Sequence, residues 1–457
     1  MRAFLIVISL ISGSQLLGQS LIVADVELLG LHRTKAQTLR QIIGIEKGDR
    51  IEIQDTTELF QSIHRNLYNT KLFTSVFLNT VSINDSITLS ISFIERWYTY
   101  ATPKFELIDR NFNEWWVVRK RDLTRIIAGL DFTQKNTTGR NDDVSVSILT
   151  GYQQKAEIAY KLPYHFLSGK LGIEVSGLFQ NHRSVNYSTE HNQLQFAAYD
   201  RPELKRYEGS ITGNYFPTYN QKRWLSLGYH LEEVTEAILE LNPNYLGTSN
   251  AELKYGFLKI GWQNDTRDVR GYAQEGNLIQ GELAAFRFAE HSSLNFIELR
   301  SRVASHVPLT DKWNTALNIG VKWSPDKERP YFLNRGLGWD VNRIRNYDYY
   351  VVDGSSYVFE KVALRYKAFD RMINLTKFPI RQFQKIPLRL VPKAYFDFAY
   401  VVNRQNSFEN SFNNQSLLSA GLGLDIVLYD DAVWRLEFGR NHIGQAAFFL
   451  NFTSAIQ

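Results

Sequence analysis

The segment Trp313–Trp323 reads WNTALNIGVKW and alternates in polarity with a period of two. Successive side chains of a β-strand point to opposite faces, so one face here carries Trp, Thr, Leu, Ile, Val and Trp. The other face carries Asn, Ala, Asn, Gly and Lys. Tilted strands of about 9–11 residues, apolar toward lipid and polar toward the interior, cross bilayers in this way. The stretch therefore predicts one strand in the wall of a transmembrane β-barrel.

The same alternation recurs along the chain from about residue 97, for example at residues 225–231 and 434–438. About sixteen antiparallel segments of this kind can be placed, and they begin near residues 98, 124, 144, 154, 169, 205, 222, 252, 277, 293, 312, 357, 388, 415, 432 and 445. An even number of strands returns both chain ends to the periplasm. The long connectors 181–204, 235–250, 325–356 and 404–414 then fall on the outer side, whereas 369–386 is a long inner connector without an explanation.

The composition supports a membrane barrel and disfavours other classes. The 457 residues include no Cys, and no internal apolar run approaches the roughly 18 residues of a membrane helix. Aromatic residues make up 14% of the chain, which suits strands and interfacial girdles. Lys and Arg alternate with Asp and Glu, so the net charge of +5 does not favour nucleic-acid binding. A soluble β-sandwich is the structural alternative, but it would have to gather all the apolar faces into one core.

The N-terminus has the features of a secretory signal. Met1 and Arg2 precede a short apolar run and a small, polar end near Gly18 to Ser20. We therefore expect residues 1–20 to be a signal peptide, residues 21–96 a periplasmic domain and residues 97–457 an outer-membrane barrel.

Residues 21–96 predict a small α+β domain of order β-α-α-β-β. Thr34 to Gln37 fits a capping box that opens a helix ending at Ile43, and a second helix starts near Asp55. Its Phe60, Ile63 and Leu67 share one face. The predicted strands cover residues 22–29, 76–81 and 87–94, with a turn at residues 84–86.

This order, together with the segment LYNTKLFTSV at residues 67–76, resembles a POTRA domain. Leu67, Phe73 and Val76 match the L-x-x-[ST]-G-x-F-x-x-V pattern of that family, and Lys71 stands where Gly is usual. The resemblance implies an exposed sheet edge, to which an extended client segment can add as a further strand.

A second resemblance lies in DVNRIRNYDYYVVDG, residues 340–354, inside the outer connector 325–356. Arg345, Tyr347, Asp353 and Gly354 resemble the V-R-G-[FY]…D-G signature of the sixth outer loop of BamA/TamA-type outer-membrane assembly proteins, with Asn346 where Gly is preferred. In that family the loop folds into the lumen and its arginine meets acidic groups of the wall. Residues 395–399, YFDFA, resemble the strand-13 motif, so the resemblance implies that Asp397 is the partner. Ala363 occupies the position at which the family often carries an inward Glu.

Two further patterns fit the same family. Asp265, Arg267, Asp268 and Gly276 resemble the turn between strands 8 and 9, although Ala273 replaces the usual Pro. This turn contains a literal VRGY at residues 269–272, which we reject as the lumen loop because about eight strand segments follow it where the family has five. The end of the chain, GQAAFFLNF, resembles a C-terminal strand signal, carried by Gly444, Phe448, Leu450 and Phe452.

The resemblance implies insertion or assembly of outer-membrane proteins by strand augmentation and lateral opening of the barrel. Its partners would be nascent outer-membrane proteins, outer-membrane lipid and periplasmic chaperones or accessory proteins. The alternatives are a two-partner secretion pore, whose relatives usually carry two POTRA units and a plug helix, and a passive porin or receptor. No phosphate loop, metal-ligand spacing or G-x-S-x-G elbow is found, so we expect no enzyme activity, catalytic residue, metal or cofactor.

Overall fold

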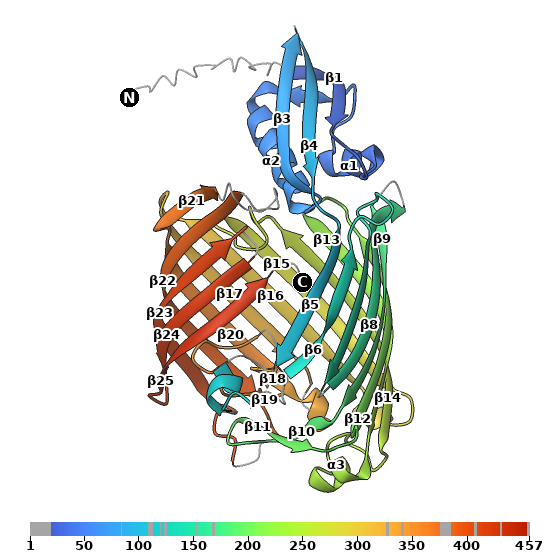
Figure 1. Cartoon of the computed structure of the whole chain (residues 1–457), viewed down its shortest axis with the longest axis vertical. Helices are drawn as coiled ribbons and strands as arrows, with labels where there is room; N and C mark the ends of the chain where they lie inside the picture. The colour runs from blue at the N-terminus through green and yellow to red at the C-terminus, as the bar shows by residue number, and fades with distance from the viewer. Residues whose placement is uncertain are drawn as a thin grey trace, which may run out of the picture. The chain divides into compact units, whose positions relative to one another are not determined.

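The computed structural model describes residues 20–83, 85–107, 113–118, 120–122, 126–151, 153–166, 170–325, 329–339, 342–374, 385–405, 409–429 and 432–454. The chain divides into two compact units, Met1–Arg96 and Trp97–Gln457 (Figure 1). Among the described residues, no helix is long and apolar enough to cross a membrane.

The first unit is a four-stranded sheet with two helices. Its elements are β1 (Ser20–Leu29), α1 (Ala36–Ile43), β2 (Arg50–Glu52), α2 (Thr56–Asn69), β3 (Phe73–Ile83) and β4 (Ser86–Glu95). The strand order is β2-β1-β4-β3, in which β1 and β4 are parallel. Alternate residues of β4 are buried, as are Leu39 and Ile42 of α1 and Ile63 and Leu67 of α2. The buried face of β4 and the buried faces of α1 and α2 thus form one apolar core between the sheet and the helices.

Two details of this unit differ from the sequence prediction. The short strand β2 was missed, because three residues are too few to show alternation. The predicted capping box does not form, since α1 has Lys35 as its N-cap with no side-chain hydrogen bond. The Thr34 amide instead donates to Glu95 of β4 at 2.8 Å, so a tertiary contact takes the place of the local cap. Asn84 of the predicted turn lies outside the described residues.

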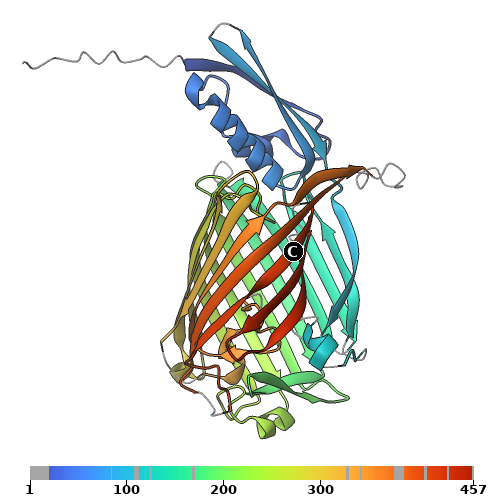
Figure 2. The ribbon, with the colours of Figure 1, turned by 90° about the vertical axis from the view of Figure 1, so that its left-hand side faces the viewer.

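The second unit is a closed antiparallel barrel (Figures 1 and 2). Its first strands are β5 (Thr99–Leu107), β6 (Ile126–Gln134), β7 (Asp143–Gly151), β8 (Gln153–Phe166), β9 (Leu171–His182), β12 (Leu204–Tyr215), β13 (Gln221–Val234) and β14 (Glu252–Asp265). They are followed by β15 (Gly276–Phe288), β16 (Phe296–Pro308), β17 (Trp313–Trp323), β20 (Ser356–Tyr366), β21 (Phe369–Asn374), β22 (Lys385–Val402), β23 (Ser416–Leu428), β24 (Ala432–Asn441) and β25 (Ala446–Ser454). Because β20 and β21 both pair with β22, they form one interrupted strand, and the wall has sixteen positions.

The predicted sixteen-stranded transmembrane barrel is therefore confirmed. The predicted faces also agree: Trp313 and Trp323 of β17 are 41% and 50% exposed, whereas Asn314 and Lys322 face the lumen and are buried. The prediction that residues 369–386 form a long inner connector was wrong, because residues 369–374 of β21 pair with residues 385–390 of β22. Residues 375–384 lie outside the described residues.

The two ends of the barrel differ. At one end, the turn end, short connections such as residues 216–220 and 309–312 join the strands. At the other, the loop end, the connections carry the hairpin of β10 (Ser184–Glu190) and β11 (Gln193–Ala198), α3 (Glu236–Leu241), and the ribbon of β18 (Arg335–Leu337) and β19 (Val352–Asp353) (Figure 1).

The loop end carries a packed cap over the barrel. Val185, Ile238, Tyr245 and Phe332 from different connections join Phe288 of β15 in one buried apolar cluster. Such contacts remove the apolar face of each loop from water and fix the loops against one another.

Asparagine side chains tie further connections into this cap. The Asn192 amide N–H donates to Asn410 Oδ1 at 2.8 Å, and Asn192 Oδ1 accepts from the Phe412 amide at 3.1 Å. The Val351 amide donates to the Asn192 carbonyl at 2.8 Å. Three connections of the loop end are thus joined by buried hydrogen bonds.

Candidate functional site

The connector between β17 and β20 folds back into the barrel. Its ribbon pairs Arg335 with Asp353, and the segment between the two strands reaches the lumen face of β20 to β24. Asn346, at the position where a Gly was expected from the resemblance, has φ of 67°. Asn tolerates this left-handed conformation better than most residues, so the sharp turn of the loop is compatible with the sequence.

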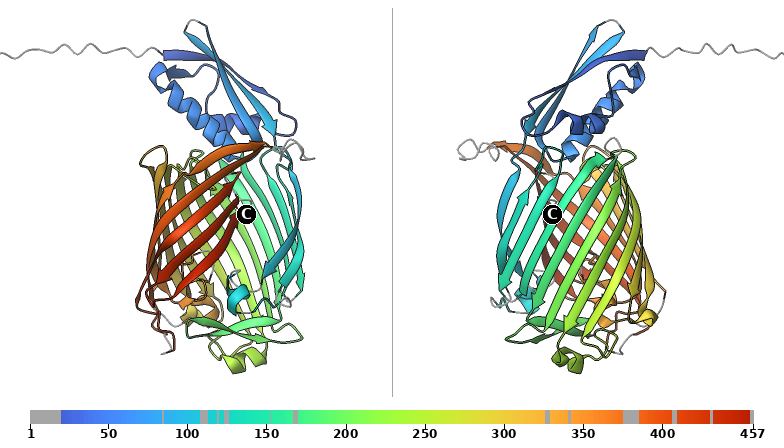
Figure 3. Two further views of the ribbon diagram at one scale, coloured as in Figure 1. Left: turned by 60° about the vertical axis from the view of Figure 1, so that its left-hand side comes forward. Right: turned by 90° about the vertical axis from the view of Figure 1, so that its right-hand side faces the viewer.

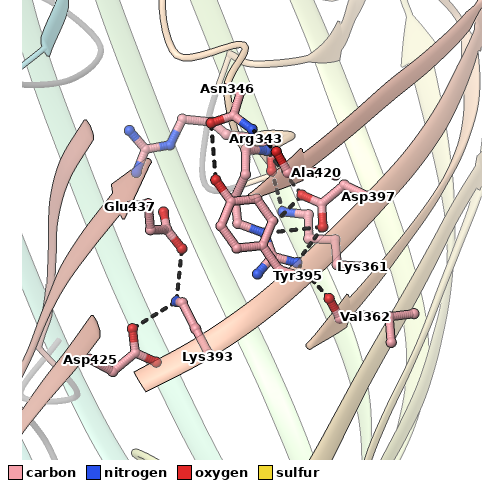
Figure 4. Close-up of polar contacts among 11 residues, drawn as sticks. Arg343, Asn346, Lys361, Val362, Lys393, Tyr395, Asp397, Ala420, Asp425 and Glu437 are labelled. Atoms are coloured by element: carbon pink, nitrogen blue, oxygen red, sulfur yellow. Dashed lines mark hydrogen bonds and ion pairs between the residues drawn. The ribbon is translucent and has the colours of Figure 1, made fainter. Parts of the chain in front are cut away.

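Arg345 from this loop meets Asp397 of β22. Figure 4 labels Asp397 with its neighbours Lys361 and Tyr395. Arg345 Nε lies 3.0 and 2.9 Å from Asp397 Oδ1 and Oδ2, Nη2 also donates to Oδ1, and the Arg345 amide donates to Oδ2 at 3.0 Å. The Asp397 side chain is fully buried and the Arg345 side chain is 16% exposed. The guanidinium also lies 4.1 Å from the centre of the Tyr395 ring. The loop is therefore anchored by a charge-assisted, multidentate contact in a shielded place.

Two neighbours on β20 set the charge balance around this pair. Lys361 lies directly opposite Asp397 in the β20–β22 ladder, and its Nζ donates to the Arg343 carbonyl. Arg345 Nη2 donates to the Val362 carbonyl at 3.1 Å. Ala363 faces the lumen without a carboxylate, as its place in the alternation predicts. Asp397 thus lies next to two cations, Arg345 and Lys361.

Next to Arg345, the loop is fixed to β22, β23 and β24 by neutral hydrogen bonds. Tyr395 Oη donates to Asn346 Oδ1 at 3.0 Å, and Asn441 Nδ2 donates to the Asn346 carbonyl at 3.1 Å. Tyr347 Oη donates to the Leu418 carbonyl at 3.0 Å. A Cβ at Gly439 would lie within 3.0 Å of Asn346 and Tyr395 side-chain atoms, so only Gly leaves room for the loop. The close approach explains why the lumen face of β24 carries Gly at that position.

A second ionic cluster lies on the same wall (Figure 4). Lys393 Nζ of β22 is 2.7 Å from Asp425 of β23 and 2.8 Å from Glu437 of β24, and all three side chains are at most 4% exposed. Tyr272, from the β14–β15 turn, donates through its hydroxyl to Asp425 Oδ2 at 2.8 Å. Arg365 packs 5.0 Å from the Tyr272 ring. The same wall is therefore held from the turn end as well.

Sequence reasoning missed this second cluster. Alternation does place Lys393, Asp425 and Glu437 on lumen faces, but their meeting depends on the register of three strands. The VRGY segment at residues 269–272 does lie in the β14–β15 turn, and its Tyr272 reaches into the lumen.

Asp353 and Gly354 do not join the Arg345 site. The Trp339 indole donates to Asp353 Oδ1 at 2.9 Å, and a Cβ at Gly354 would collide with Val401 and Val402 of β22. Burial raises the pKa of Asp353 to about 6, against the lowering effect of hydrogen bonds from Thr189 and Trp339. These two residues thus fix the base of the loop instead of its tip.

The remaining predicted residues occupy three separate places. Asp265, at the end of β14, binds Arg267 at 2.7 Å, Asp268 accepts from the Gln274 amide at 3.0 Å, and Gly276 has φ of 95°, so these residues shape the β14–β15 turn. In the first unit, Leu67, Phe73 and Val76 are core residues, and Lys71 has the positive φ of 60° that suits the usual Gly. In β25, Phe448 and Phe452 point outward, and Gly444 with φ of 84° lies in the preceding turn.

The last and first strands of the barrel meet at a seam. β25 and β5 are hydrogen-bonded neighbours in the closed order. Among the described residues this pair has no residue register, whereas every other pair of neighbouring wall strands has one when β20 and β21 are taken as one strand. The short helical turn Glu114–Val118 lies near β25 (Figure 3, left). Asn113, directly before this turn, binds the Leu450 backbone of β25. Asn113 Nδ2 donates to the Leu450 carbonyl at 3.4 Å, and the Leu450 amide donates to Asn113 Oδ1 at 3.2 Å. The buried Asn113 amide thus bonds to one residue of β25 as a neighbouring strand would.

Among the described residues, no group of three or more His, Cys, Asp or Glu side chains is placed to hold a metal ion. The arrangement of charges around Arg345 and Lys393 can hold a loop and a wall together.

Comparison with known proteins identifies the first unit and the fold of the second. Residues 21–96 match the POTRA family model, described as surface antigen variable number repeat. BamA from Haemophilus ducreyi lacking POTRA domains 1–3 is similar with a TM-score of 0.54 at 14% identity, over 95% of this chain and 84% of that one. CdiB from Escherichia coli gives a TM-score of 0.58 at 11% identity, over 94% and 75%. No curated protein sequence matches. The resemblance to BamA/TamA-type proteins is therefore confirmed for the POTRA domain and for the fold.

Proposed function

We propose that this chain, which has a POTRA domain and a barrel of the BamA and CdiB fold, assembles other β-barrel proteins in an outer membrane. The turn end and the POTRA domain would then face the periplasm and the loop end the outside. The observation that carries the proposal is the seam, where β25 is bonded at Leu450 by the Asn113 side chain.

The proposed mechanism is strand augmentation at β25. A strand edge presents N–H and C=O groups that an incoming extended segment can bond. A client strand would replace Asn113 at Leu450 and extend the ladder, so the protein groups that lose their partners regain them. The step exchanges one hydrogen-bond partner for another and needs no covalent chemistry.

The lumen loop supports the proposal because it contacts β25 from inside. The Tyr349 and Phe449 rings lie 5.4 Å apart, and Asn451 Nδ2 donates to Asp348 Oδ1 at 3.4 Å. Tyr350 donates to Gln445 at 2.9 Å, in the turn before β25. The anchor at Arg345 would thus keep the last strand in place while its other edge is exchanged.

The POTRA domain offers a second docking edge. β3 is the outermost strand of its sheet and pairs with β4 alone. Phe77, Val81 and Ile83 on it are 53%, 58% and 69% exposed. An extended client segment could bond this edge before it reaches the barrel.

A secretion pore is the competing function, and the cap at the loop end disfavours it. A polypeptide passing through the lumen would have to separate the cluster around Tyr245 and Phe332 and the hydrogen bonds of Asn192. Separating β25 from β5 at the seam requires no break in this cluster or in the hydrogen bonds of Asn192.

Photocrosslinking in cells tests this assignment. Crosslinkers at Lys104 of β5, Phe448 of β25 and Val81 of β3 should capture nascent barrel proteins. A crosslinker at Ser419, on the lumen face of β23, is the matched control and should capture little. Capture of an exported polypeptide at Ser419, with none at the seam, would establish the secretion pore instead.

A further inference from the structure

The outer surface of the barrel carries an apolar groove half-way around the strand order from the seam. It has a volume of about 790 Å³, within the range of about 300–1,000 Å³ typical of ligand sites, and crosses β12 to β16 near the turn end. Its lining comes mainly from outward side chains such as Leu225, Ile260 and Leu283, which are 49%, 54% and 44% exposed. The wall that contains β12 faces the reader in Figure 3, right.

The strand registers show how the groove is formed. Gly213 lies in one outward row with Leu225, Ile260 and Leu283. A Cβ built on Gly213 meets no atom within 4 Å, so the absence of a side chain there leaves open space. The groove therefore exists because Gly213 has no side chain to fill the space between its large apolar neighbours.

A row of two aromatic side chains and one arginine bounds the groove toward the turn end. Tyr215 of β12, Arg223 of β13 and Trp262 of β14 are direct neighbours across the strands and all point outward. Tyr and Trp favour the level of the lipid headgroups, so this row lies at the membrane interface.

The Arg223 side chain makes no hydrogen bond or ion pair with any residue that the structure describes. A cation on the lipid-facing wall is unfavourable unless an anion or water reaches it, and a basic side chain at a membrane surface attracts anionic headgroups.

We infer that this groove binds one anionic phospholipid, with an acyl chain along Gly213, Leu225 and Ile260 and the headgroup phosphate on Arg223. The apolar floor and the single cation at its interfacial end match the two parts of such a lipid. This site lies on the opposite wall from the seam and does not depend on the proposed function.

Native mass spectrometry of the full chain in a nonionic detergent tests the inference. Delipidated protein is mixed with phosphatidylglycerol or with phosphatidylcholine of the same acyl chains, and the lipid retained per chain is counted. The wild type should retain one phosphatidylglycerol in preference to phosphatidylcholine. Arg223→Gln should remove that preference, a loss of about fivefold for the anionic lipid, as expected for one cation at an anionic surface.

Gly213→Leu tests the other half of the site, because it fills the groove without touching the charge. It should lower retention of both lipids by about tenfold, since several methylene groups lose their burial. Gly209→Leu is the matched control: it points outward from the same strand, has room for a Cβ and does not line the groove. Arg287→Gln, an exposed outward arginine near the loop end of β15, controls for surface charge.

The two controls should behave as wild type, and all variants should keep the heat-dependent mobility of a folded barrel. Equal retention of both lipids by the wild type, equal loss in Arg223→Gln and Arg287→Gln, or full retention in Gly213→Leu would each overturn the inference.

Discussion

The wall of β20 to β24 and the seam between β25 and β5 are held together differently. In the wall, buried ion pairs link strands and loop from the lumen side, as with Asp397 and Arg345 or Lys393 and Asp425. At the seam, the described residues show the hydrogen bonds of Asn113 with Leu450. Removing one partner of a buried ion pair is strongly destabilising, whereas a hydrogen bond to a strand edge is replaced by another strand at little cost. We therefore expect the barrel to be rigid where the loop docks and exchangeable where its ends meet.

The largest loss of stability is expected in the wall from Lys393→Met. Asp425 and Glu437 would remain as two buried carboxylates with no cation between them. We expect a loss of about 3–5 kcal/mol. The midpoint of urea unfolding, followed by the shift in electrophoretic mobility of the unboiled chain, measures it. Lys205→Met, at an exposed lysine of β12, should change the midpoint little; equal effects would show that the cluster does not stabilise the wall.

Asp397→Ala should lower stability by about 3 kcal/mol, at the lower end of the range for buried pairs, because Arg345 is partly exposed. Hydrogen exchange of residues 342–354 should become faster, and client assembly should fall. Arg345→Ala should act in the same way. Adding Ala363→Glu to Asp397→Ala should restore part of the protection, since the new carboxylate faces the lumen beside Val362. Unchanged exchange in both single variants would remove the pair from its anchoring role.

Gly439→Ala tests the close approach of loop and wall. The added methyl group would collide with Asn346 and Tyr395, and overpacking of this kind costs about 1–3 kcal/mol. Faster hydrogen exchange should be confined to the loop and β24. Gly209→Ala on the outward face of β12 is the control, because its Cβ has room. A loop that exchanges equally slowly in both variants would mean that the wall yields at Gly439.

Asp353 gives the base of the loop a dependence on pH. Its pKa is raised to about 6 by burial, so the docked loop favours the protonated carboxyl. The stabilising effect is complete below the unfolded value near 3.8 and is lost as the pH rises through about 6, a change of about 1–3 kcal/mol. After correction for the intrinsic pH dependence of amide exchange, the loop should be better protected at pH 5 than at pH 7.5, and Asp353→Asn should reduce this difference. His442 titrates in both the wild type and the Asp353→Asn variant, so the comparison between them isolates the effect of Asp353. An identical pH profile in the two would contradict the assignment of the pH dependence to Asp353.

The smallest effect on stability is expected at the seam. Asn113→Ala removes two hydrogen bonds to one residue of a strand edge, each worth about 0.5–1.5 kcal/mol, and water can replace part of them. Hydrogen exchange of the Leu450 amide should become faster, because its acceptor on Asn113 is lost. If Asn113→Ala destabilised the barrel as much as Lys393→Met, the contrast between wall and seam would be wrong.

The sequence predicts which face of the barrel wall a side chain occupies better than it predicts which side chains are in contact. Alternation places Asp397 in the lumen, and the family resemblance supplies Arg345 as its partner. Neither signal finds Lys393 with Asp425 and Glu437, because their contact depends on how three strands are shifted against one another.

Strand ends were also harder to predict than strand centres. Residues 369–374 form β21, but five of the six are exposed, so no apolar face marks them as a strand. Thr34 fits a local cap and is used instead in a tertiary contact with Glu95. No sequence pattern predicts the contact of Asn113 with Leu450, because a side chain that bonds to a strand edge can come from any loop.

The seam contact also bears on the order of folding. Asn113 and Leu450 are 337 positions apart in the chain, whereas neighbouring strands elsewhere in the barrel follow one another in chain order. Bringing such distant segments together has the largest entropic cost, so it should occur after the local hairpins have formed. An open, curved sheet with two free edges would precede the barrel, and its last strand would be the last to find a partner. The place where we propose that the mature barrel opens is thus also the place where the nascent barrel closes.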